Sequence, residues 1–153
     1  MTLFQVLLRP NDTFQRLPAS GSLARAYGFC AVTLAMASVL SWWMAAAERG
    51  TPLTAVSLVV RLLPWMLIPA VAGCVLHGLL KVARLKSKAW TLTFRVMCYV
   101  VGSWAPLMWI PHAGVLVGMT WCVYVTSVAL RHTHRIDGLR ASVVTLMAAP
   151  LIA

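Results

Sequence analysis

Residues 53–80 read LTAVSLVVRLLPWMLIPAVAGCVLHGLL, and residues 81–88, which follow directly, read KVARLKSK. The first stretch contains a single charged residue, Arg61, and is longer than the roughly 20 apolar residues that a helix needs to cross a bilayer. The second stretch is short and strongly basic. The same alternation recurs on both sides of these residues, with long apolar runs joined by short connections. This pattern predicts a membrane protein made of helices, with basic connections on one side of the bilayer.

The composition supports a membrane location. The chain has 153 residues, of which 61% are hydrophobic and 10% charged, and a mean hydropathy of +0.83. A soluble domain of this size is about half apolar and about a quarter charged, so these residues could not cover a surface that faces water. The net charge of +10 comes from 13 basic and three acidic residues. Because the basic residues flank apolar runs, they indicate membrane topology and contact with anionic lipid rather than nucleic-acid binding.

We expect an all-α bundle with five membrane spans. These cover approximately residues 24–47, 53–80, 90–110, 115–130 and 139–153. In the second span, Arg61, Pro64 and Pro69 predict a kink or a break. The fifth span is the shortest, because about fifteen helical residues rise only about 22 Å against a hydrocarbon core of about 30 Å. A bundle of four spans followed by a re-entrant segment is therefore the alternative.

The residues ahead of the first span form an amphipathic arm. We divide the chain into this arm, residues 1–22, and a five-span domain, residues 23–153. No secretory signal peptide is expected, because the first apolar run is too short. Pro10 interrupts the helical spacing, and Asn11 or Asp12 is expected to cap a second short turn. The arm is predicted to lie in the headgroup plane, with a mobile tail as the alternative.

The basic residues predict the orientation. Eleven of the 13 fall in three regions on one face of a five-span chain: Arg9, Arg16, Arg25; Lys81, Arg84, Lys86, Lys88, Arg95; Arg131, Arg135, Arg140. Short connections with such an excess face the cytoplasm. We therefore expect a multi-pass protein with its N-terminus in the cytoplasm and its C-terminus outside. The candidate contacts with anionic lipid are Lys81, Arg84, Lys86, Lys88, Arg131, Arg135 and Arg140.

One candidate site lies at the opposite face. Arg61 is several residues inside the second span, and a charge at the bilayer centre costs at least about 2.5–3.5 kcal/mol. Glu48 ends the first span across a short turn, so an ion pair between Glu48 and Arg61 would reduce the cost for both. This would be a polar pocket for a lipid or a partner helix. The alternative is an Arg61 side chain that extends to the headgroups.

Catalytic and metal-binding motifs are missing from the sequence. There is no GxSxG, HExxH or glycine-rich phosphate loop, and three carboxylates leave few candidates for acid–base chemistry. His132 and His134 are two residues apart and would point to different sides of a helix. We expect neither enzyme activity nor a metal or cofactor.

The order of several residues resembles the Yip (Ypt/Rab-interacting protein) domain family. The matching positions are His77, Ser87, Phe94, Tyr99, Pro106, Pro111, Gly114, Trp121, His134 to Ile136, Arg140, Ala141 and Pro150. The opening Pro10, Thr13, Phe14 and Leu17 is similar to the start of bacterial members. The resemblance implies five spans with a cytoplasmic N-terminus. It also implies a role in binding membrane proteins, since eukaryotic members resemble adaptors that bind prenylated GTPases in vesicle traffic. This chain has only about two dozen residues before its first span, so GTPase binding is not expected. The resemblance instead implies a bacterial-type member, located in the bacterial cytoplasmic (inner) membrane.

Three functions remain open. The first is a non-enzymatic membrane protein that binds other membrane proteins, associates with itself or organises anionic lipid. The second is a small transporter or lipid-handling protein with a path near Arg61. The third is an accessory subunit of a larger membrane complex.

Overall fold

The computed structural model describes residues 3–18, 21–49, 54–85, 89–109 and 114–152, and all regular structure in these ranges is helical. The elements are α1 (Leu3–Leu8), α2 (Pro10–Gln15), α3 (Leu23–Arg49), α4 (Ala55–Val82), α5 (Trp90–Trp104), the 3-10 helix η1 (Ala105–Trp109), α6 (Gly114–His134) and α7 (Gly138–Ile152). The predicted all-α fold is confirmed.

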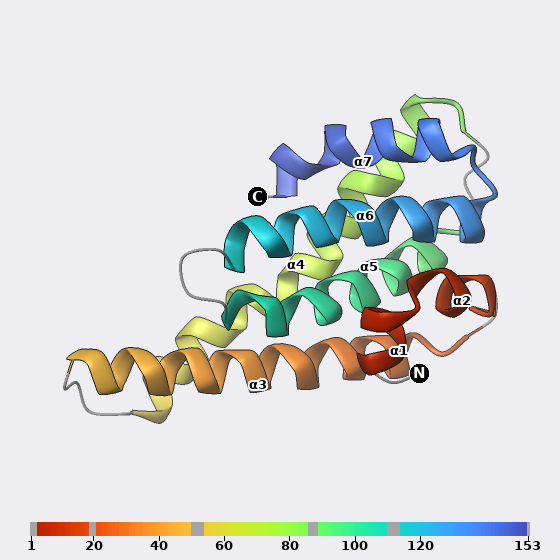
Figure 1. Cartoon of the computed structure of the whole chain (residues 1–153). Helices are drawn as coiled ribbons and strands as arrows, with labels where there is room; N and C mark the ends of the chain where they lie inside the picture. Colours follow the sequence, from red (N-terminus) through yellow and green to blue (C-terminus); the bar gives the residue numbers. More distant parts are fainter. Residues whose placement is uncertain (1–2, 19–20, 50–53, 86–88, 110–113, 153) are drawn as a thin grey trace.

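The five long helices run in alternating directions, as Figure 1 shows. The beginnings of α3, α5 and α7 therefore share one end of the bundle with the ends of α4 and α6. Helix α5 is central, because it packs against α3, α4 and α6, and 11 of its 15 residues are buried. Helix α7 packs against α4 and α6.

Helices α3 and α4 have the character of membrane helices. Residues Leu23–Glu48 and Val56–Val82 are long and apolar enough to cross a bilayer, yet only 22% and 18% of their most apolar windows are buried. A core helix of a soluble protein would be mostly buried. One exposed face of α4 carries Val56, Val60, Leu63, Leu67 and Val71, spaced three to four residues apart as on one side of a helix. Such a stripe is stable next to lipid and costly next to water.

The second span was predicted to be kinked or broken; the break is wrong, and the kink stays a prediction. Helix α4 continues without interruption from Ala55 to Val82, with Pro64 and Pro69 inside it. Its start is fixed by Thr54, whose side chain accepts a hydrogen bond from the backbone N–H of Ser57 at 3.3 Å. Prolines are tolerated inside membrane helices where neighbours satisfy the carbonyls that they leave free.

The third predicted span begins where expected but changes its geometry before it ends. Helix α5 stops at Trp104, and Pro106 lies in the following 3-10 turn. Proline has no N–H for the α-helical hydrogen bond to the residue four positions earlier, which accounts for the change at this position. The next family-pattern residue, Pro111, lies outside the described residues.

The N-terminal arm folds back onto the bundle as two short helices, α1 and α2 (Figure 1). Helix α2 begins with Pro10 at its first position, after Arg9, which makes no side-chain cap. The predicted cap by Asn11 or Asp12 is therefore wrong. Proline is favoured at the first position of a helix, so α2 begins at Pro10 and both residues lie inside its first turn. Val6 and Phe14 are fully buried and belong to the main core. The arm is thus packed on protein, while its position in the headgroup plane stays a prediction.

Candidate functional site: the basic end of the bundle

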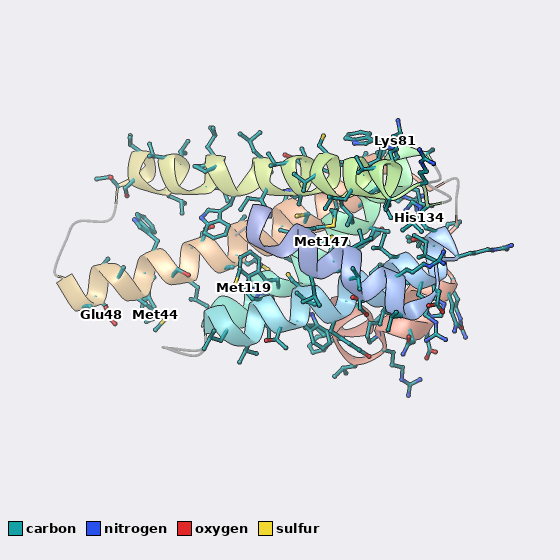
Figure 2. All side chains as sticks on the ribbon, turned by 90° about the horizontal axis from the view of Figure 1, so that it is seen from above. Met44, Glu48, Lys81, Met119, His134 and Met147 are labelled. Carbon is teal, nitrogen blue, oxygen red and sulfur yellow. The ribbon has the colours of Figure 1, made fainter. Side chains whose placement is uncertain are left out.

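Positive charge gathers at the end of the bundle where α4 and α6 finish. Figure 2 places Lys81 and His134 at this end and Glu48 at the other. We call this region the basic end and define its surface by five exposed side chains, Lys81, Arg84, Arg131, Arg135 and Arg140. The other predicted lipid contacts, Lys86 and Lys88, lie outside the described residues. Nearby Asp137 accepts a hydrogen bond from the backbone N–H of Leu139 at 3.3 Å, at the start of α7.

Two arginines of this surface have left-handed backbones. Arg84 has a φ of 53° and Arg135 a φ of 55°. At Arg84 the turn closes with two backbone hydrogen bonds of 3.0 Å, from Arg84 N to the Lys81 carbonyl and from Leu85 N to the Leu80 carbonyl. This is the Schellman arrangement, which most often uses glycine at the left-handed position. The chain therefore carries a charged side chain where glycine would fit with less backbone strain.

A buried polar contact joins three helices just inside the basic end. Thr93 on α5 has its hydroxyl oxygen 3.3 Å from Nδ1 of His77 on α4 and 3.3 Å from Nε2 of His134 on α6. Thr93 is fully buried and His134 is 2% exposed. The hydroxyl has one proton to donate. If both imidazole rings are neutral and both contacts are hydrogen bonds, one ring must accept the hydroxyl proton. The other ring must then donate its own N–H to the hydroxyl oxygen.

Sequence reasoning found both histidines through the family pattern but missed Thr93. His77 lies near the end of one predicted span and His134 near the end of another, so the topology brings them to the same end. Thr93 carries no signal of its own, because a threonine in the first turn of an apolar helix is common. The contact is explained by the tight packing of α5 between α4 and α6.

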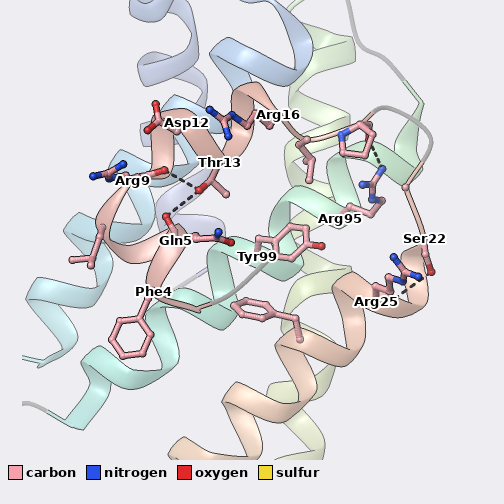
Figure 3. Close-up of a pocket in the computed structure, with 15 residues that line it drawn as sticks. Phe4, Gln5, Arg9, Asp12, Thr13, Arg16, Ser22, Arg25, Arg95 and Tyr99 are labelled. Atoms are coloured by element: carbon pink, nitrogen blue, oxygen red, sulfur yellow. Dashed lines mark hydrogen bonds between the residues drawn. The ribbon is translucent and has the colours of Figure 1, made fainter.

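A cavity of about 820 Å³ separates the N-terminal arm from α3 and α5. Figure 3 shows its lining, which includes arginines from three parts of the chain. Arg9 and Arg16 come from the arm, Arg25 from the first turn of α3 and Arg95 from α5, and Asp12 is the acidic residue that lines the cavity. Arg9, Arg16 and Arg25 are exposed. The cavity is thus open at a rim that carries most of its positive charge.

Arg95 lies in the inner wall of this cavity. Its side chain is 3% exposed, and its Nη1 donates a hydrogen bond of 2.9 Å to the carbonyl oxygen of Pro18. Gly21 lies directly against the guanidinium group, so that a Cβ at this position would overlap it. The sequence analysis grouped Arg95 with the basic residues predicted to face the cytoplasm. In the structure it instead connects α5 to the segment between the arm and α3 (Figure 3).

The remaining family-pattern residues have packing positions. Tyr99 is 6% exposed, stands against Phe29 with ring centroids 5.3 Å apart, and lines the cavity one turn after Arg95. Gly114 is the buried first residue of α6.

The predicted Glu48–Arg61 site lies at the other end of the bundle. Glu48 is exposed near the end of α3, and Arg61 is in the second turn of α4. The side chain of Arg61 lies outside the described part of the chain, so the ion pair stays a prediction. The arm, whose residues line the cavity, lies beside the start of α3, whereas Glu48 is near the other end of that helix (Figure 1).

The two neighbouring histidines point apart, as their spacing predicted. His132 has its Nε2 3.2 Å from Oδ1 of Asn11 on α2, while His134 points into the bundle toward Thr93. Within the described ranges, no group of three His, Cys, Asp or Glu side chains is placed to hold a metal ion.

Apolar outward faces, alternating helix directions and a basic end define a helical membrane protein. A model of the Yip1 domain matches residues 4–153 of the chain. The protein therefore belongs to the Yip1 domain family, and the predicted resemblance is confirmed. Comparison with curated proteins and with solved structures gave no match.

Proposed function

We propose that this protein acts without catalysis, by gathering anionic lipid or membrane-protein partners at the basic end of its bundle in a bacterial inner membrane. One observation carries the proposal. Five exposed basic side chains from the ends of α4 and α6 and the start of α7 share one end, although they are up to 59 positions apart (140 − 81) in the sequence.

The charge balance supports an anionic partner. The chain has 13 basic and three acidic residues, so the protein itself cannot neutralise the basic end. A basic side chain near an anionic leaflet contributes about 1 kcal/mol of attraction. A cluster of this kind would enrich anionic lipids around the bundle or hold an acidic segment of a partner.

The orientation follows from the same residues. Basic connections remain on the cytoplasmic side during insertion, so the N-terminal arm and the basic end would face the cytoplasm. The alternating helices are consistent with five spans. Helix α7, with 15 residues, leaves four spans and a re-entrant segment as the alternative.

The proposal is tested in vesicles that contain the full-length protein and a trace of dansyl-labelled lipid. Trp90, which is 39% exposed at the start of α5, serves as one energy-transfer donor near the basic end. Wild-type protein should transfer more energy to dansyl-phosphatidylglycerol than to dansyl-phosphatidylcholine. The variant Lys81→Gln/Arg84→Gln/Lys86→Gln/Lys88→Gln should lose this difference. An unchanged preference would contradict lipid enrichment by this surface.

A partner protein is tested separately. Copurification of a fixed partner in mild detergent, lost in the same four-residue variant, would favour membrane-protein binding. A pure, partner-free species with a strong lipid preference would favour lipid organisation.

A further inference from the structure

The cavity between the N-terminal arm and the bundle is a separate feature from the exposed basic surface. Lys81, Arg84, Arg131, Arg135 and Arg140 are absent from its lining, which draws instead on α1, α2, the start of α3 and α5. Its volume of about 820 Å³ falls within the range of about 300–1,000 Å³ that is typical of ligand sites. The cavity therefore has room for a ligand larger than an ion.

The lining has a charge excess that the protein cannot balance. Four arginines, Arg9, Arg16, Arg25 and Arg95, and one acidic residue, Asp12, are among the residues that line the cavity. The other two acidic residues of the chain, Glu48 and Asp137, do not line the cavity. The lining therefore has a net formal charge of +3, from four arginines and one aspartate, which favours an anion from outside the protein.

The geometry suits a tetrahedral oxyanion. The arginines that line the cavity come from the arm, α3 and α5. Each guanidinium has a planar fork of N–H donors that matches phosphate oxygens. In Figure 3, Arg16 and Arg25 lie on different sides of the cavity, and the ring of Tyr99 projects between them. The Tyr99 hydroxyl adds a neutral donor on the inner wall.

One wall of the cavity is apolar. Phe4 and Leu8 are one turn apart on α1 and are 72% and 75% exposed, and Phe29 continues this wall on α3. Exposed aromatic and leucine side chains on a short amphipathic helix are typical of a segment that contacts acyl chains. The cavity thus combines a cationic rim with an apolar wall at one end of the membrane helices.

We infer that this cavity binds a phosphate-bearing anion, with the apolar wall placed to receive the acyl chain when the phosphate belongs to an anionic phospholipid. The inference rests on the proposed function, because it assigns one specific binding place at the same end of the bundle. It differs in predicting a defined stoichiometry and dependence on the arm arginines rather than on the exposed surface.

The test uses full-length protein in neutral detergent and isothermal titration calorimetry with three probes. These are short-chain phosphatidylglycerol, short-chain phosphatidylcholine and inorganic phosphate. The cavity variant is Arg9→Gln/Arg16→Gln/Arg25→Gln. Its matched control is Lys81→Gln/Arg131→Gln/Arg140→Gln, which removes the same charge from exposed positions outside the cavity. All six positions are exposed, and circular dichroism verifies that both variants remain folded.

We expect one phosphatidylglycerol per chain, with the zwitterionic lipid bound more weakly. The cavity variant should lose the one-per-chain binding step, with affinity falling by about tenfold for each arginine whose charge-assisted hydrogen bonds are removed. The variant of the basic surface should keep this one-per-chain step and lose only the weaker additional lipid contacts of that surface. Inorganic phosphate that binds as tightly as the lipid would support the anion site and identify a soluble phosphate compound as the source. Equal losses in the two variants, or no binding of either phosphate probe, would overturn the inference.

The two proposals can fail separately. The cavity inference falls and the proposed function stands under one combination of results. In it, the cavity variant binds like wild type, while the four-residue variant Lys81→Gln/Arg84→Gln/Lys86→Gln/Lys88→Gln loses lipid enrichment in vesicles. If the reverse holds, the basic surface has no role in lipid enrichment and the cavity remains the lipid site.

Discussion

Thr93 on α5 and His134 at the end of α6 are 41 positions apart in the sequence, yet the Thr93 hydroxyl oxygen lies 3.3 Å from Nε2 of His134. The same oxygen is 3.3 Å from Nδ1 of His77 on α4. One hydroxyl group therefore connects three helices where they meet at the basic end. These are long-range contacts in a protein whose other threonine bonds mostly return to the same helix.

Replacing Thr93 with valine keeps the shape and removes the hydroxyl. We expect a loss of about 1–3 kcal/mol in the free energy of unfolding, because the buried His134 and the partly buried His77 lose a common partner. Thermal unfolding in detergent, followed by circular dichroism, measures the change. The matched control is Thr145→Val, since Thr145 is buried and donates only to Ala141 of its own helix at 2.8 Å. Equal destabilisation by both variants would show that the connection between helices contributes nothing specific.

Gly21 is predicted to be required for the docking of the arm. A Cβ at this position would overlap the Arg95 guanidinium, so Gly21→Ala should displace the hydrogen bond to Pro18 and cost about 1–3 kcal/mol. Limited proteolysis of the arm provides the measurement, with faster cleavage expected in the variant.

A second glycine gives the opposite expectation. Gly28 lies inside α3 and has open space around the position of a Cβ. Gly28→Ala should therefore stabilise the helix by about 0.5–1 kcal/mol. If both alanine variants changed cleavage of the arm alike, contact with Arg95 would not explain the effect of Gly21.

Two substitutions at Arg84 distinguish the effect of its charge from the effect of its left-handed backbone. Arg84→Gly and Arg84→Ala remove the same charge, but only glycine adopts a φ of 53° without a steric cost of about 1–2 kcal/mol. The glycine variant should therefore be the more stable of the two by about 1 kcal/mol, as measured by chemical unfolding. Both variants should lose the same amount of lipid preference in vesicles. Equal stabilities would mean that the turn tolerates alanine without strain.

The sequence predicted the architecture well because the strongest signals are long and repeated. Apolar runs and basic connections fix which helix ends lie together, and the start of α5 at Trp90 agrees with the prediction. Local geometry was less accessible. Pro64 and Pro69 suggested a kinked or broken span because proline removes a helical hydrogen bond, and of these the break is wrong, because α4 continues through both prolines. Pro10 was correctly interpreted as an interruption, since α1 ends at Leu8, but the second helix begins at Pro10 itself rather than after a cap at Asn11 or Asp12.

The candidate site was predicted only in part. The exposed basic residues could be assigned to one end by counting charges in the connections. The cavity could not be predicted, because it depends on how the short arm folds back and buries Val6 and Phe14. Nor does any pattern in the sequence place Arg95 beside Pro18, which is 77 positions away. Such contacts depend on packing rather than on periodicity.

The orientation of the basic end is the central claim, and the lysines of the chain allow a direct test. Lys81, Lys86 and Lys88 lie in one connection, and Glu48→Lys adds a reporter at the opposite end of the bundle (Figure 2). A membrane-impermeant amine reagent is applied to intact cells and to inverted membrane vesicles, and the labelled peptides are identified by mass spectrometry. We predict labelling of the three native lysines in inverted vesicles only and of the introduced lysine in intact cells only. Labelling of the native lysines in intact cells, or of both ends from the same side, would contradict the account.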